Sequence, residues 1–316
     1  MSQFIRYLQD YFQKHFHLGF YLSVTLFLGL GIFLNYRFDF ENSFIDSFHQ
    51  TWAQWPLMSI VTMFPFLVIC GLLYLFNLNR KWLFSLEFWL LFLLATLLIG
   101  FQRSFFLHYT IVDLFELSDR LFIGKLLWYL KSYIITLVPL LVFYRFYEYP
   151  QDPHKSWYGL KVKGSDFRPY LFLILLVFVG IGLASFIGDL TRYYPRFDKS
   201  GGDIFAQAHG IPEWVSILFF ELLYGLNFLN IEFFFRGFLV IGFSRILGGN
   251  AVMAMVGAYV FLHFGKPMAE CISSAFGGYI IGAFAFYSKR IWGGVALHVA
   301  LAWSMEFFAW LQKSLY

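Results

Sequence analysis

The chain has 316 residues, of which 59% are apolar, 23% aromatic and only 13% charged. Soluble domains carry about 25% charged residues, so this composition excludes an ordinary soluble enzyme and a disordered chain and predicts a protein solvated largely by lipid. The net charge of +4 is spread over many short segments. It forms no basic stripe of the kind that binds nucleic acid, and we expect no such partner. Two cysteines, Cys70 and Cys271, lie in apolar runs and are interpreted as packing residues.

The first segment of the chain predicts an amphipathic helix at the membrane surface. Phe4, Leu8, Phe12 and Phe16 recur every four residues among polar side chains. A simple helical extension of the first membrane span is the alternative. If the N-terminus is cytoplasmic, the inner segments hold nine Lys and Arg and the outer loops hold seven. This difference favours a cytoplasmic N-terminus.

Apolar runs near the 20 residues needed to cross a bilayer predict an all-α, polytopic transmembrane helical bundle with eight to ten spans. These runs cover residues 18–36, 55–76, 83–101, 126–147, 169–190, 214–247, 251–264, 271–288 and 291–311. The run 214–247 is too long for one span, and Gly225, Asn227 and Asn230 inside it predict a break into two helices. The run 251–264 is short, so we expect other helices to enclose it.

The sequence divides at the segment 149–168, which holds two prolines and six charged residues and predicts a polar linker loop. Before it, residues 1–148 contain the amphipathic helix and a four-span region. After it, residues 169–316 form a second part, in which charged side chains are buried. We found no internal repeat, which argues against a transporter built from two similar halves.

The second part carries ionisable residues where lipid is expected. In chain order they are Glu221, Glu232, Arg236, His263, Glu270, His298 and Glu306. A charged group at the bilayer centre costs at least about 2.5 kcal/mol, so these side chains must satisfy one another or face a polar cavity. Glu232 and Arg236 stand four residues apart and share one face of an α-helix, where they can pair. A plain buried ion pair and hydrogen-bonded core histidines are the alternatives.

Taken together, these groups can do chemistry. A Glu and two His on three helices, with an Arg to hold a carboxylate, are the groups needed to deprotonate water and stabilise an oxyanion. Glu232, His263 and His298 could instead bind a divalent metal such as zinc, because imidazole and carboxylate are ordinary zinc ligands. The chain has no His-Glu-x-x-His motif, so the spacing is not that of a zincin.

Three motifs carry a resemblance. The chain contains Glu232-x-x-x-Arg236, Tyr259-x-x-x-His263 and His298-x-x-x-Ala302. They resemble the CPBP family (CAAX protease and bacteriocin-processing enzymes, also called the abortive-infection group) of helical intramembrane proteases, over residues 169–316 at most. The family signature reads Glu-Glu-x-x-x-Arg, aromatic-x-x-x-His and His-x-x-x-Asn or Asp. This chain departs from it at Ile231, where the family has the first Glu, and at Ala302, where it has Asn or Asp.

The resemblance implies an intramembrane endopeptidase that cleaves peptide bonds near the membrane surface, with Glu232 and His263 activating water and His298 stabilising the oxyanion. Glu270 and Glu306 are the candidates to replace the missing carboxylate. The cofactor is a divalent metal or none, and the expected partners are membrane lipid and a peptide or membrane protein. The expected location is the bacterial cytoplasmic membrane. A catalytically silent membrane scaffold or binding protein is the alternative, and a transporter with a proton relay is the third hypothesis.

Overall fold

The computed structural model describes residues 2–152, 155–163, 165, 167–186 and 190–315. Within these residues the chain is helical and contains no β-strand, which confirms the all-α prediction. Seven helical runs in this part of the chain are long and apolar enough to cross a membrane. The protein is therefore an integral multi-pass membrane protein.

The number of candidate spans is below the predicted eight to ten. One cause is the helical run Glu213–Phe261, which has 49 residues and joins segments that we predicted as separate spans. Another is the predicted span 169–190, where the described apolar helix is the shorter Tyr170–Ala184. Residues 187–189 of that predicted span lie outside the described residues.

The helices form two compact units that interleave along the chain. The first comprises Met1–Phe105, Pro139–Ser165 and Phe233–Ile291, and the second comprises Phe106–Val138, Asp166–Glu232 and Trp292–Tyr316. Each unit draws on sequence from both sides of the predicted linker 149–168, of which residues 153, 154, 164 and 166 lie outside the described residues. The division of the sequence into residues 1–148, 149–168 and 169–316 therefore stays a prediction.

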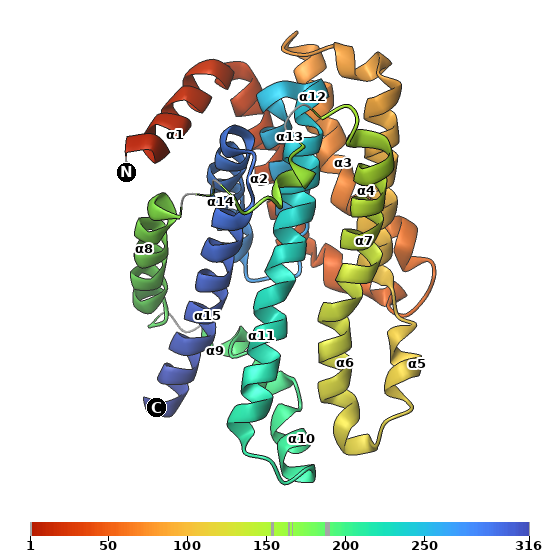
Figure 1. Ribbon diagram of the computed structural model, residues 1–316, viewed down its shortest axis with the longest axis vertical. Helices are drawn as coiled ribbons and strands as arrows, with labels where there is room; N and C mark the ends of the chain where they lie inside the picture. The colour runs from red at the N-terminus through yellow and green to blue at the C-terminus, as the bar shows by residue number, and fades with distance from the viewer. Residues whose placement is uncertain (1, 153–154, 164, 166, 187–189, 316) are drawn as a thin grey trace. The chain divides into compact units, whose positions relative to one another are not determined.

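The first unit is built around α13 (Ala251–Phe261), in which every residue except the last is buried. Helices α3 (Gln54–Leu75) and α14 (Met268–Ser288) pack against it (Figure 1). With 11 residues, α13 is only about 16 Å long, too short to cross a bilayer. As expected for the run 251–264, other helices enclose it.

The other helical segments of the first unit are α1 (Ser2–His15), α2 (Leu18–Phe38), η1 (Glu41–Ile45), η2 (Asp46–Phe48), η3 (Lys81–Phe84), α4 (Leu86–Ser104), α7 (Val138–Phe143), η5 (Tyr144–Glu148), η6 (Trp157–Gly159), η8 (Phe233–Gly242), α12 (Ser244–Leu247) and η9 (Gly248–Asn250). Residue Val138 of α7 belongs to the second unit. Among these segments, η8 is a π-helix of ten residues, all of them buried. π-Helical turns are rare and occur often at functional sites.

The N-terminal helix α1 is separate from the first span. It ends at His15, and α2 begins at Leu18 with His17 as its N-cap, so the alternative of a simple helical extension is wrong. Phe12 and Phe16 are exposed, whereas Tyr11 is buried and donates a hydrogen bond to the carbonyl of Gly249 at 2.8 Å. The helix is therefore amphipathic, with one aromatic face packed on the protein and another outside it.

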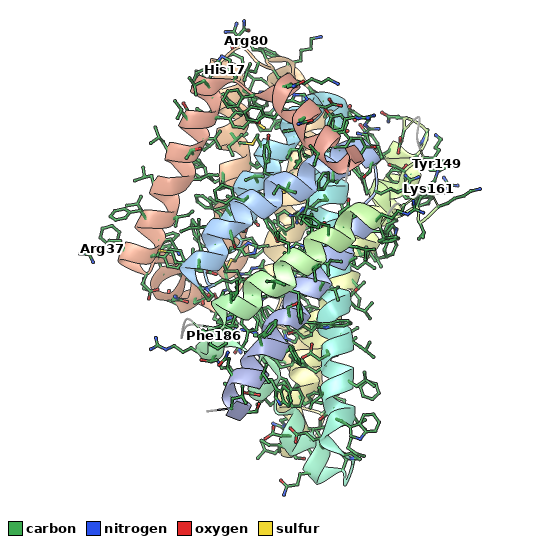
Figure 2. The ribbon with its side chains drawn as sticks, turned by 90° about the vertical axis from the view of Figure 1, so that its left-hand side faces the viewer. His17, Arg37, Arg80, Tyr149, Lys161 and Phe186 are labelled. Atoms are coloured by element: carbon green, nitrogen blue, oxygen red, sulfur yellow. The ribbon has the colours of Figure 1, made fainter. Side chains whose placement is uncertain are left out.

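Helix α2 presents an apolar outer face. Leu22, Leu26 and Leu30 are spaced four residues apart and are 54%, 73% and 57% exposed. Such a row of exposed leucines needs an apolar environment, as expected for a helix that faces lipid. Figure 2 shows the labelled His17 and Arg37 at opposite ends of this helix.

The end of α2 holds the turn that follows α13. The side chain of Asn35 donates to the carbonyl of Phe264 at 3.2 Å and accepts from the backbone amide of Glu41 at 3.1 Å. The hydroxyl of Tyr36 donates to the carbonyl of Lys266 at 2.6 Å. These bonds satisfy backbone groups that have no helical partner, and they fix the chain directly after His263.

The second unit is built on the packing of α11 (Glu213–Glu232) against α15 (Trp292–Leu315). Its other segments are α5 (His108–Val112), α6 (Leu117–Ser132), η4 (Tyr133–Leu137), α8 (Arg168–Ala184), α9 (Leu190–Tyr193), η7 (Phe197–Lys199) and α10 (Gly202–Ala208). Helix α6 packs on α11 through Tyr129 and Phe220, whose rings meet edge to face at 5.8 Å. Helix α8 packs on α15, where Gly182 leaves room for Phe308.

The predicted break at Gly225, Asn227 and Asn230 is wrong, because α11 continues through all three residues. A Cβ atom on Gly225 would lie 3.1 Å from the ring of Trp303, so this glycine serves close helix packing. The side chain of Asn227 accepts a hydrogen bond from Ser132 at 3.1 Å. The regular helix ends later, at Glu232, and the π-helix η8 follows it.

Candidate functional site

The second unit brings together two of the predicted site residues. Glu232 is the last residue of α11 and is fully buried, and His298 lies in the second turn of α15. The Oε1 atom of Glu232 lies 2.5 Å from Nδ1 of His298, and the imidazole side chain is 12% exposed. A carboxylate and an imidazole that are 66 residues apart in sequence thus form a direct, buried contact.

The contact sets the chemistry of the ring. When Glu232 is ionised it can only accept a hydrogen bond, and the hydrogen that it shares with His298 then lies on Nδ1 of the imidazole. In the neutral imidazole the lone pair is then at Nε2, which makes that atom a proton acceptor. A base whose other nitrogen is held by a carboxylate is the arrangement that activates water or hydroxyl nucleophiles in many enzymes.

A residue that the sequence analysis missed also positions His298. Phe228, one turn before Glu232 on α11, stacks on the imidazole with a centroid distance of 5.4 Å and an interplanar angle of 15°. It is 8% exposed. Its position four residues before Glu232 places both side chains on one helix face, but with 44 phenylalanines in the chain this spacing alone does not single it out.

Glu306 belongs to a different contact in the second unit. Its Oε1 and Oε2 atoms accept the backbone amide hydrogen of Arg196 at 2.8 and 2.9 Å. Glu306 also lies eight residues after His298, about 12 Å further along α15. The structure therefore does not place Glu306 as a second carboxylate beside His298, because both its oxygens hold the chain at Arg196.

Two other predicted residues meet in the first unit. Arg236 in η8 is fully buried, and its guanidinium carbon lies 4.3 Å from the centre of the Tyr259 ring. The Nδ1 atom of His263 lies 2.7 Å from the carbonyl oxygen of Tyr259, and the two rings are 4.5 Å apart. A carbonyl oxygen only accepts, so His263 also carries its hydrogen on Nδ1 when neutral. Tyr259 is thus the residue that links Arg236 with His263.

Glu270 has an ion-pair partner in the first unit. It lies in the first turn of α14, and its Oε1 atom is 2.5 Å from Nζ of Lys266. Its side chain is 18% exposed and that of Lys266 is 35% exposed. This contact gives Glu270 a structural role at the start of the helix, where a carboxylate is favoured by the helix dipole.

The predicted metal ligands are divided between the units. Glu232 and His298 lie in the second unit and His263 in the first. A catalytic zinc site needs three protein ligands. Within either unit, the described residues contain no group of three His, Cys, Asp or Glu side chains that could hold a metal ion. The predicted pairing of Glu232 with Arg236 assumed that both residues lie on one α-helix. The α-helix α11 ends at Glu232, and Arg236 lies in the π-helix η8.

The two departures from the CPBP motifs lie in apolar positions. Ala302 is fully buried in α15, and Ile231 is partly buried in α11. Neither supplies the carboxylate or amide that the family pattern has there. Comparisons of the chain with protein-family models, curated proteins and solved structures found no match.

Proposed function

We propose that the protein is an intramembrane endopeptidase of the CPBP type in which His298, oriented by Glu232, activates water. The observation that supports this proposal is the 2.5 Å contact between Glu232 and His298 at a buried position. It assigns the base differently from the sequence analysis, in which Glu232 worked with His263 and His298 stabilised the oxyanion.

The contact supports peptide-bond hydrolysis in which His298 carries the proton from water to the leaving amine. Nε2 of His298 takes a proton from water as the water oxygen bonds to the carbonyl carbon of the peptide. The same proton then passes to the amide nitrogen as the carbon–nitrogen bond breaks. Glu232 stabilises the imidazolium formed between these steps, and Phe228 keeps the ring in one plane. The role in water activation that the family resemblance gives to His263, and any role of Arg236, stay predictions and are tested by their own alanine variants.

The proposal is tested by comparing peptide ends in membranes of cells that produce the wild type or a variant. Mass spectrometry counts the ends that appear only with the wild type. Glu232→Gln keeps the shape of the side chain and removes its charge, and we expect those ends to fall by about 10²-fold or more, the usual share of a general base. Glu221→Gln is the matched control on the same helix and should retain them.

Glu232 and His298 should also depend on each other in catalysis. The double variant Glu232→Gln, His298→Ala is expected to be no worse than His298→Ala alone, because either change removes the same function. Equal amounts of folded, inserted protein are verified by its melting temperature in detergent. Wild-type cleavage by Glu232→Gln would overturn the proposal.

The second candidate is a catalytically silent membrane scaffold that keeps the fold. The fully buried Ala302 favours it, since the amide or carboxylate of the family motif is absent there. A scaffold would retain its bound membrane proteins in the double variant, and no peptide ends would depend on Glu232. Cleavage that requires Glu232 and His298 excludes this candidate.

A further inference from the structure

The first unit contains a pocket of about 150 Å³ whose lining includes four charged side chains. This volume equals that of roughly five water molecules. The residues that line it come from three parts of the chain: Tyr144, Glu148, Asp152, Ser156 and Tyr158; Ile241, Gly242, Ser244 and Arg245; and Lys289 after α14. None of these residues belongs to the proposed catalytic pair.

The acidic side of the pocket is held in place by hydrogen bonds. Asp152 Oδ2 accepts from the hydroxyl of Tyr144 at 2.6 Å and from both the amide and the hydroxyl of Ser156 at 2.8 Å. Glu148 Oε1 lies 3.1 Å from Nη2 of Arg245. The same Arg245 atom lies 2.6 Å from Oε1 of Glu87, which is outside the pocket. Arg245 is therefore already neutralised by protein carboxylates.

Lys289 is the cation of the pocket with the fewest acceptors. Its Nζ donates to the hydroxyl of Ser244 at 3.0 Å and lies 4.7 Å from the centre of the Phe286 ring, and no ion pair with a carboxylate is found for it among the described residues. An ammonium group has three donors, so one hydroxyl does not satisfy it. Burial lowers the pKa of Lys289, and Asp152 opposes this effect. An anion beside Nζ would stabilise the charged form.

The backbone around the pocket adopts uncommon conformations. Seven non-glycine residues in the described chain have positive φ, and four of them, Lys155, Trp157, Tyr158 and Lys289, lie in or beside the pocket segments. Such conformations are unfavourable outside glycine and persist where the surroundings impose them, often at ligand sites. The surroundings here are tight, since a Cβ atom on Gly237 would lie 2.5 Å from the carbonyl oxygen of Tyr158.

Two of the lining residues lie at the ends of candidate membrane spans. Glu148 is the last residue of the span Leu117–Glu148, and Lys289 follows the last residue of Met268–Ser288. The rings of Trp157 and Tyr149 lie nearby with their centroids 5.6 Å apart, and such aromatic residues are enriched at the level of the lipid head groups. Figure 2 shows the labelled Tyr149 and Lys161 at the margin of this unit.

We propose that this pocket binds the head group of a zwitterionic phospholipid with a primary ammonium, with the phosphate at Lys289 and Ser244 and the ammonium at the Glu148 and Asp152 side. Two acids and two bases line the pocket, so a ligand with one charge of each sign matches it better than a simple anion, which the carboxylates would repel. A primary ammonium can donate to these carboxylates, and a quaternary one cannot.

The test uses the full-length protein in detergent with native mass spectrometry, which counts bound lipid molecules. We expect phosphatidylethanolamine to bind in preference to phosphatidylglycerol and phosphatidylcholine. Lys289→Asn removes the ammonium and keeps a residue that tolerates positive φ. We expect it to weaken phosphatidylethanolamine binding about tenfold, the usual effect of losing one charge-assisted hydrogen bond. Lys289→Arg should retain binding, as should the matched control Lys81→Asn at an exposed site of the same unit.

Free O-phosphoethanolamine distinguishes a lipid head group from a soluble compound with the same charged groups as the ligand of the pocket. Displacement of the bound lipid by the free compound at high concentration would support the head-group site. Binding of the free compound with no preference among the lipids would overturn the membrane source. Preference for phosphatidylglycerol would overturn the zwitterion assignment. If the wild type and Lys289→Asn bind phosphatidylethanolamine equally, and all variants melt at the same temperature as the wild type, the proposed site is wrong.

Discussion

The ring of Phe228 lies almost parallel to the imidazole of His298, at a centroid distance of 5.4 Å. Glu232 holds the edge of the same imidazole at Nδ1. Phe228 and Glu232 thus restrain His298 from two directions. Both lie on one face of α11, so the helix sets their relative position.

We predict that Phe228→Leu lowers the proposed cleavage several-fold without unfolding the protein. Leucine keeps most of the buried apolar area but loses the stacking interaction, which is worth about 0.5–1.5 kcal/mol. The measurement is the rate of production of the wild-type-dependent peptide ends, together with its pH profile, because a freely rotating imidazole no longer keeps its contact with Glu232. The control is Phe219→Leu, an exposed position on the same helix. A merely structural Phe228 would change stability and leave the pH profile as in the wild type.

We predict that Glu306 matters for stability and not for the chemical step. Glu306→Ala leaves the partly buried amide of Arg196 without its acceptor, and an unsatisfied donor shielded from water costs up to about 1–3 kcal/mol. Glu306→Gln keeps one acceptor oxygen and should lose less. Denaturant unfolding in detergent measures both effects. Cleavage per folded molecule should remain at the wild-type level, and a specific loss of cleavage in Glu306→Gln would instead restore Glu306 as a catalytic candidate.

We predict that Glu41 makes the protein less stable as the pH rises above the ordinary range of a glutamate. Burial raises the pKa of Glu41, while Arg103, at 3.4 Å, opposes the rise. A carboxyl group with a raised pKa binds its proton more tightly in the folded state than in the unfolded state. Its contribution to the free energy of unfolding is therefore largest at low pH and is lost as the pH rises through the raised value.

The measurement for Glu41 is the melting temperature in detergent over a series of pH values. Glu41→Gln should remove this part of the pH dependence and melt higher than the wild type at neutral pH. Glu213→Gln, at the exposed start of α11, is the control and should follow the wild-type curve. A steeper loss of stability at neutral pH in Glu41→Gln would show that the Arg103 ion pair outweighs burial.

We predict that Gly237→Ala destabilises the protein and that Gly277→Ala does not. The added methyl group at 237 would lie 2.5 Å from the carbonyl oxygen of Tyr158, a backbone atom that cannot move without shifting the pocket segment. Overpacking of this kind costs about 1–3 kcal/mol. At Gly277 in α14 nothing lies within 4 Å, so alanine should stabilise the helix slightly. Chemical unfolding compares the two, and the order of their stabilities is the critical result.

Hydropathy was sufficient to predict the helical class and most of the spans, because an apolar run of sufficient length leaves few other structures possible in lipid. The short, enclosed α13 also followed from length alone. The break at Gly225 and Asn227 was predicted wrongly, since neighbouring side chains, Trp303 and Ser132, compensate both residues. No local sequence pattern indicated the π-helix η8.

The site residues Glu232 and His298 could be identified individually, because charge and imidazole are rare in apolar runs. Their pairing could not, because it depends on α11 and α15 being neighbours, and the sequence does not state which helices pack together. Phe228 was hidden for a different reason. The chain has 44 phenylalanines, and one that contacts a histidine does not differ in sequence from one that contacts lipid.

The hydrogen bonds from Asn35 and Tyr36 to the turn after α13 have a consequence for engineering. A fragment starting at residue 169 would keep all three sequence motifs and lose both donors, so the carbonyls of the buried Phe264 and the half-buried Lys266, directly after His263, would lose these partners. The part of the chain that carries the motifs, residues 169–316, therefore cannot be transferred alone with its structure intact. A graft or truncation that aims to preserve the geometry of His263 has to carry the first span with it.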